Sequence, residues 1–148
     1  MVFGYHGGYL RVDVTDGTAR RMPLAESLLR EYIGGSGLGA RLLLDEGGAI
    51  ADPLSPAAPL VFAFSPLVGS PLTTSAKFAV VSRSPLTERI NDSLASSGFA
   101  LAGKKTGSDA IVIVGRAASL SVLVIDDGEV RLESAEDVRG DACPVAEE

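Results

Sequence analysis

The segment GYLRVDVTDGTARRM, residues 8–22, decides the fold class of this chain, because it holds a strand, a tight turn and a returning strand. Every second residue from Leu10 to Val14 is apolar, which is typical of a strand with one buried face. Asp16-Gly17 suits the positive φ angles of a short hairpin turn. Residues 18–22 are therefore predicted to return antiparallel, so the chain begins with a β-hairpin.

Helices are predicted at three places further along the chain. Pro23 suits a helix start, and leucines at helical spacing extend the pattern to about Ile33. The glycine-bearing segment 34–39, GGSGLG, then separates this helix from a second one, predicted over 38–46. A third helix is predicted over 99–105.

The glycine segment itself has two interpretations. Small residues at a helix start let backbone N–H groups approach an anion, but a dinucleotide fingerprint needs a strand before its glycines. Here a helix precedes them, so the sequence favours a close corner between two helices.

Apolar runs predict the remaining strands, at residues 60–64, 78–82, 110–114 and 120–125. The last two runs are continuous, which predicts strands covered on both faces. A second Asp-Gly turn at 127–128 predicts a return over 129–133, and a segment resembling a capping box at 134–137 predicts a short last helix. Residues 91–98 are small and carry no strand pattern.

Strands outnumber helices and do not alternate regularly with them. We therefore expect an α+β fold, with one large mixed, largely antiparallel sheet and a few covering helices, in a single domain over residues 1–148.

Composition excludes several classes of function. The chain has 148 residues and a net charge of -6 without a basic patch, which argues against nucleic-acid binding. Its apolar runs are too short to span a membrane, and no secretory apolar region is found, so a cytoplasmic location is expected. The single Cys143 and the single His6 exclude a self-contained iron–sulfur or zinc site. No catalytic or metal-ligating residue is predicted.

Five segments, in order, resemble the N-terminal domain of the aldehyde ferredoxin oxidoreductase family. They are residues 8–17, YIGGSGLGA at 32–40, DPLSP at 52–56, SPLT at 84–87 and KKTGSDAI at 104–111. The resemblance implies a fold in which two similar α+β halves carry a tungsten or molybdenum bis-pterin cofactor, with this chain supplying about one half. It also implies oxidation of an aldehyde to a carboxylate, with electrons passing through a [4Fe–4S] cluster to ferredoxin. This chain alone would not bind that cluster, because the cluster cysteines and the acid–base groups of the family lie in later domains.

The resemblance also implies which residues touch the pterin. An arginine of the family aligns with Lys77, and an Asn-Ser-Gly-Gly segment aligns with Leu94, Ala95, Ser96 and Ser97. Lysine keeps a positive charge for a pterin phosphate but loses planar two-point donation. Leu94 loses the side-chain hydrogen bonds of asparagine, whereas Ser96 and Ser97 keep backbone N–H groups. Ser93 joins the candidate set, although Ser93 and Ser97 are equally typical of turn and helix-cap residues.

Two functions are compatible with these observations. In the first, the chain is the cofactor scaffold of an oxidoreductase that is completed by further domains or by a catalytic partner chain. In the second, the altered loop no longer holds a cofactor, and the chain is a non-catalytic assembly module that forms a homodimer through an exposed sheet edge.

Overall fold

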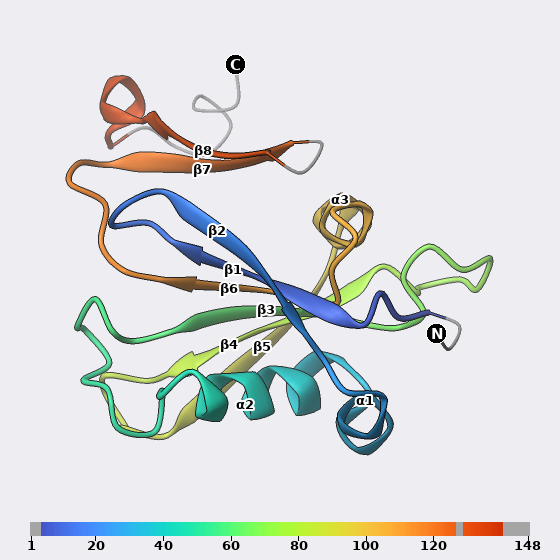
Figure 1. The fold of residues 1–148 in the computed structure, drawn as a ribbon. Coiled ribbons are helices and arrows are strands. Elements are labelled where there is room, and N and C mark those ends of the chain that lie inside the picture. The colour runs from blue at the N-terminus through green and yellow to red at the C-terminus, as the bar shows by residue number, and fades with distance from the viewer. Residues whose placement is uncertain (1–3, 127–128, 141–148) are drawn as a thin grey trace.

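The computed structural model describes residues 4–126 and 129–140. Its centre is a six-stranded sheet with the order β2-β1-β6-β3-β4-β5 (Figure 1). β1 and β6 pair in parallel, and the other neighbours in this sheet are antiparallel. The predicted α+β class with a mixed, largely antiparallel sheet is confirmed. The strand bounds are β1 Gly8–Asp13, β2 Thr18–Pro23, β3 Leu60–Phe64, β4 Lys77–Arg83, β5 Ile90–Ser96 and β6 Ala110–Val114.

The opening hairpin forms as the sequence predicted. β1 and β2 pair in a register that runs from Gly8 opposite Pro23 to Asp13 opposite Thr18. Gly17 takes a φ of 70° in the turn, a conformation that glycine adopts without steric cost.

Two helices, α1 (Glu26–Tyr32) and α2 (Gly35–Asp45), cover one face of the sheet, which we call the α1–α2 face (Figure 1). α2 begins at Gly35 rather than at Leu38, so the glycines form its first turn. A Cβ on Gly34 would lie 2.9 Å from the carbonyl oxygen of Phe64. The glycine segment is therefore a close helix corner packed against the end of β3.

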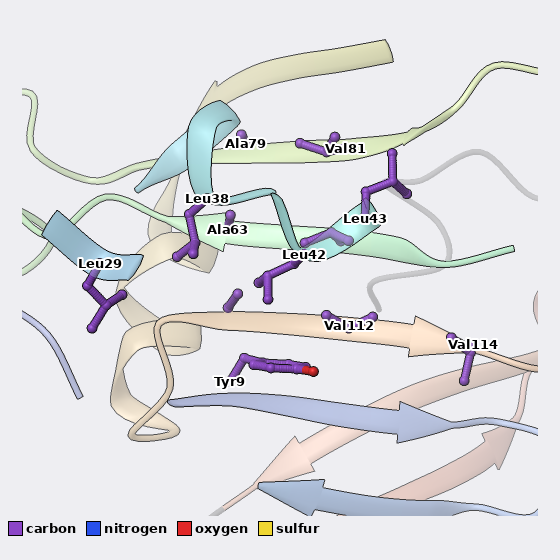
Figure 2. Close-up of a cluster of buried hydrophobic side chains, with 12 residues drawn as sticks. Tyr9, Leu29, Leu38, Leu42, Leu43, Ala63, Ala79, Val81, Val112 and Val114 are labelled. Atoms are coloured by element: carbon purple, nitrogen blue, oxygen red, sulfur yellow. The ribbon is translucent and has the colours of Figure 1, made fainter. Parts of the chain in front are cut away.

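Two hydrophobic cores lie on opposite sides of the sheet. Tyr9, Leu38 and Leu42 are at the centre of the core beneath α1 and α2 (Figure 2). On the other side, the α3 face, Val12, Phe64 and Ile111 form a second core. Helix α3 (Gly98–Lys105) and a β-hairpin lie over that face (Figure 1). The strand residues alternate between the two cores, as the pleat requires.

The structure corrects the prediction of a single large sheet. β7 (Ser121–Asp126) and β8 (Glu129–Ser134) form a separate two-stranded sheet. Strand β7 is therefore not covered on both faces, and Val122 is half exposed. Of the β7 residues, Leu123 and Ile125 pack against the α3-side core. The predicted Asp127-Gly128 turn lies outside the described residues.

A second correction concerns residues 91–98, which were not predicted to be a strand. Residues 90–96 form β5, the edge strand next to β4. All seven residues of β5 are exposed, so neither face selects for apolar side chains and the usual alternation is absent. The predicted last helix is a single 3-10 turn, Glu136–Val138. Within the described residues, no helix is long and apolar enough to cross a membrane.

Candidate functional site

Lys77 and Ser96 lie side by side at one end of the sheet. Lys77 is the first residue of β4 and Ser96 the last of β5, and the antiparallel register places them directly opposite each other. The Lys77 Nζ donates a hydrogen bond of 2.9 Å to the Ser96 Oγ. Two candidate residues that are 19 positions apart in the sequence thus form one exposed polar pair.

Strand alternation divides the other candidates between the two faces. Leu94 and Ser96 point to the same side as Lys77, the α1–α2 face, because opposite residues of a ladder share a face. Ser93 and Ala95 point to the α3 face, since they lie opposite Val80 and Phe78. A ligand on one face of β5 therefore cannot contact all of these side chains.

The backbone of β5 shows which groups are available to a ligand. Ser97 N donates to the Ala76 carbonyl and Ser84 N to the Arg89 carbonyl. Hydrogen-bonded and non-hydrogen-bonded pairs alternate along an antiparallel ladder, so the odd-numbered residues of β5 bond to β4. The even-numbered residues, Ile90, Asp92, Leu94 and Ser96, direct their N–H and C=O groups outward. We call these groups the outer edge of β5.

Ser97 occupies a structural position rather than an open one. Its Oγ accepts a hydrogen bond of 3.1 Å from Phe99 N and caps helix α3, and its own N–H bonds to Ala76. The Ser97 N–H is thus already hydrogen-bonded within the chain, and the contact of Ser97 with a cofactor stays a prediction. The alternative interpretation of Ser97 as a helix cap is confirmed. The Ser96 N–H is directed outward.

Packing between aromatic rings holds α3 directly behind this segment. The Phe99 ring lies 4.9 Å from the Phe78 ring and 5.5 Å from the Phe62 ring, measured between centroids. At the next turn, a Cβ on Gly103 would overlap the buried ring of Phe64. α3 is thus fixed close to the sheet, and the chain leaving β5 is fixed with it.

A buried ion pair that sequence reasoning missed secures the other end of α3. Lys104 Nζ lies 2.6 Å from Asp109 Oδ1, and the Asp109 side chain is 1% exposed. The same carboxylate accepts hydrogen bonds from the backbone N–H groups of His6, Gly7 and Gly8. The residues that meet here are about a hundred positions apart, so no local pattern indicates the contact.

The donor set suits the anionic, organic part of a cofactor rather than a metal ion. Four groups can donate hydrogen bonds to an anion. They are the exposed ammonium of Lys77, the Ser96 hydroxyl and the outward N–H groups of Leu94 and Ser96. In the described part of the chain, no group of three His, Cys, Asp or Glu residues could hold a metal. The donors of Lys77 and Ser96 therefore fit an anionic group such as a phosphate.

Residues 9–148 match the family described as "Aldehyde ferredoxin oxidoreductase, N-terminal domain". The chain belongs to this family. It is 38% identical over 141 residues to a tungsten-containing aldehyde ferredoxin oxidoreductase of Pyrococcus abyssi, and 36% identical to that of Pyrococcus horikoshii. It is also 33% identical to the WOR-like subunit of an aliphatic sulfonate oxidoreductase of Pyrococcus furiosus.

A solved structure has the same fold as this chain. The active site complex BamBC of benzoyl coenzyme A reductase, bound to 1,5-dienoyl-CoA, superposes with a TM-score of 0.91 at 28% identity. The superposition covers 99% of this chain and 22% of that one. Likewise, the Pyrococcus alignments cover 94% of this chain but only 23% of each relative. The chain thus spans about a quarter of its relatives' length.

Proposed function

We propose that residues 1–148 form one domain, which supplies part of the scaffold for a tungsten- or molybdenum-bispterin cofactor in an oxidoreductase. The carrying observation is the Lys77–Ser96 pair beside the outer edge of β5, within a domain of the aldehyde ferredoxin oxidoreductase family. Further domains or a partner chain would complete the enzyme. The coverage of only 23% of the tungsten-containing relatives supports this division.

The donors on this chain would hold the cofactor by its charged groups. Lys77 would supply a cation to a pterin phosphate, since its ammonium is exposed and already orders the Ser96 hydroxyl. The outward N–H groups of Leu94 and Ser96 would add backbone donors, which the Leu94 side chain does not obstruct, because side chains stand perpendicular to the sheet. Loss of the family's asparagine side chain at Leu94 therefore leaves the backbone contact possible.

When bound, the cofactor would supply the redox chemistry, in which an aldehyde and water give a carboxylate, protons and two electrons. We further propose that these electrons leave through a [4Fe–4S] cluster in the remaining domains to a ferredoxin, and that the protein is cytoplasmic. The role of this chain is to bind and orient.

Replacing Lys77 tests the scaffold function. In the complete enzyme, Lys77→Ala should lower the tungsten or molybdenum content per chain severalfold. The free energy of unfolding should change by less than about 1 kcal/mol, because the lost hydrogen bond is exposed. Lys105→Ala, which removes another exposed lysine, is the matched control and should leave metal content unchanged. Equal metal content in both variants would remove Lys77 from the site.

A second candidate function is a non-catalytic assembly module. The observation in its favour is that β5 is an exposed edge strand. Leu94-Ala95-Ser96-Ser97 stands where the resemblance implies Asn-Ser-Gly-Gly. Metal and pterin analysis of the protein, purified with its partners attached, separates the two functions. Metal in proportion to the chain supports the scaffold, whereas its absence with partners present supports the assembly module.

A further inference from the structure

The two edges of the six-stranded sheet differ in what they offer to another strand. Leu24 N donates to the Gly7 carbonyl, which is a hydrogen-bonded pair of the β1–β2 ladder. Because such pairs alternate with non-hydrogen-bonded pairs, the N–H and C=O groups of Ala19, Arg21 and Pro23 point away from β1 wherever these groups are present. Proline has no N–H group, which leaves the outer edge of β2 with two donors. The outer edge of β5 has four, on Ile90, Asp92, Leu94 and Ser96.

Side chains reinforce this difference between the edges. β2 carries Arg20 and Arg21, and charged residues and proline are the usual protection of an edge strand against further pairing. β5 carries one charged side chain, Asp92, which accepts a hydrogen bond of 2.5 Å from Ser36 Oγ on α2. Among the described residues, none pairs with the outer edge of β5. β5 is thus the unprotected edge of this domain.

We propose that, in the absence of cofactor, the outer edge of β5 binds the same edge of a second copy of this chain. The two strands run antiparallel about a twofold axis at Leu94. Antiparallel pairing of identical strands makes the interface isologous and closed, and the two sheets become one. Leu94 of each copy lies opposite Leu94 of the other, and Asp92 of each copy lies opposite Ser96 of the other.

Side-chain chemistry favours this register. The Leu94 side chain is 67% exposed in the single chain, and the axis brings two such side chains together on the α1–α2 face. Asp92 of one copy lies opposite Ser96 of the other. The Ser96 hydroxyl oxygen accepts a hydrogen bond from the Lys77 ammonium of its own copy. Two carboxylates thus approach two lysines of opposite charge. The register makes about six backbone hydrogen bonds, two at each of three residue pairs.

The main alternative to this dimer register has its twofold axis at Ser93 instead of Leu94. It uses all four outward residues, but it sets Leu94 opposite Asp92 twice. Each carboxylate would then face an apolar side chain, and neither lysine would lie near it. Opposite-charge and apolar pairs stabilise a ladder, whereas this arrangement supplies neither.

The dimer and the cofactor scaffold are alternative states of the same edge. Both use the outward groups of Leu94 and Ser96, so a cofactor bound there would exclude the second copy. Dimerisation requires neither cofactor nor any further domain. It is therefore measured on the 148-residue chain alone, and its failure would leave the Lys77→Ala result unaffected.

Sedimentation equilibrium on the isolated chain tests the dimer. We expect a concentration-dependent monomer–dimer equilibrium. Leu94→Lys should raise its dissociation constant at least about tenfold, because it places two lysine side chains of like charge directly opposite each other. Leu86→Lys is the matched control, because Leu86 is 91% exposed in the turn before β5. A strictly monomeric parent, an unaffected Leu94→Lys variant or an equal loss with Leu86→Lys would each overturn the proposal.

Cysteine cross-linking tests the register in a Cys143→Ser background. Paired Cα atoms at Leu94 would be roughly 5.5 Å apart, within the range of a disulfide, so Leu94→Cys should form a covalent dimer on oxidation. The two Ser96 residues would be about 13 Å apart along the strands, so Ser96→Cys should not form a covalent dimer. Cross-linking of Ser93→Cys in place of Leu94→Cys would establish the shifted register and refute ours.

Discussion

Asp109→Asn is predicted to destabilise the fold more than any exposed charge change. The substitution keeps the shape of the side chain but removes the charge that four donors share: Lys104 Nζ at 2.6 Å and the N–H groups of His6, Gly7 and Gly8. The Lys104 side chain is only 9% exposed, so its ammonium would remain buried without a counter-ion. Breaking a buried pair in this way costs about 3–5 kcal/mol.

Urea denaturation followed by circular dichroism measures this loss. For a domain of this size the expected change corresponds to a melting temperature lower by roughly 6–20 °C, at about 2–4 °C per kcal/mol. Lys104→Met should lose less, about 1.5–3 kcal/mol, because it removes the cation and leaves Asp109 with its three backbone donors. The double variant should be more stable than the sum of the two losses predicts, because the residues are coupled.

Glu26→Gln is the matched control for Asp109→Asn. It makes the same carboxylate-to-amide change in an ion pair with Arg30, whose side chains are 57% and 69% exposed. An exposed pair of this spacing contributes less than about 0.5 kcal/mol. A loss below about 1 kcal/mol for Asp109→Asn, or strict additivity with Lys104→Met, would refute the assigned role of the buried pair.

Two further predictions concern packing and pH. Gly103→Ala should destabilise the domain by about 1–2 kcal/mol in urea denaturation, because the new Cβ displaces the buried Phe64 ring. Gly98→Ala is the control: Gly98 is in the same helix with open space around it, so this change should be neutral or stabilising. Equal effects of the two changes would contradict the packing argument. Burial and a hydrogen bond to Glu46 raise the pKa of Tyr9 well above its ordinary value. Above a pH of about 10, the unfolded state therefore releases the Tyr9 proton while the native state keeps it, and the free energy of unfolding should fall as the pH rises. Tyr9→Phe should flatten that fall, and an unchanged slope would exclude Tyr9 as its source.

The candidate site could be foreseen only in part from the sequence. Resemblance to the family selected Lys77 and Leu94–Ser97, and the structure brings Lys77 and Ser96 into contact. Neither the division of these residues between two faces nor the bond from Ser97 to Ala76 is visible in the sequence, because both depend on the register with β4. A shift of register by one residue would reverse every side-chain direction.

The sequence by itself determined the local elements, whose causes lie within a few residues. The alternation in β1, the Asp16-Gly17 turn and the glycine corner before α2 are examples. Tertiary structure alone decided that residues 90–96 form a strand, because β5 gains its conformation from pairing with β4 and not from its own apolar pattern. It also decided the placement of β7 and β8 in a separate sheet and the meeting of Asp109 with the first residues of the chain. These contacts join distant segments, so their free energy depends on the whole fold and leaves no local pattern to read.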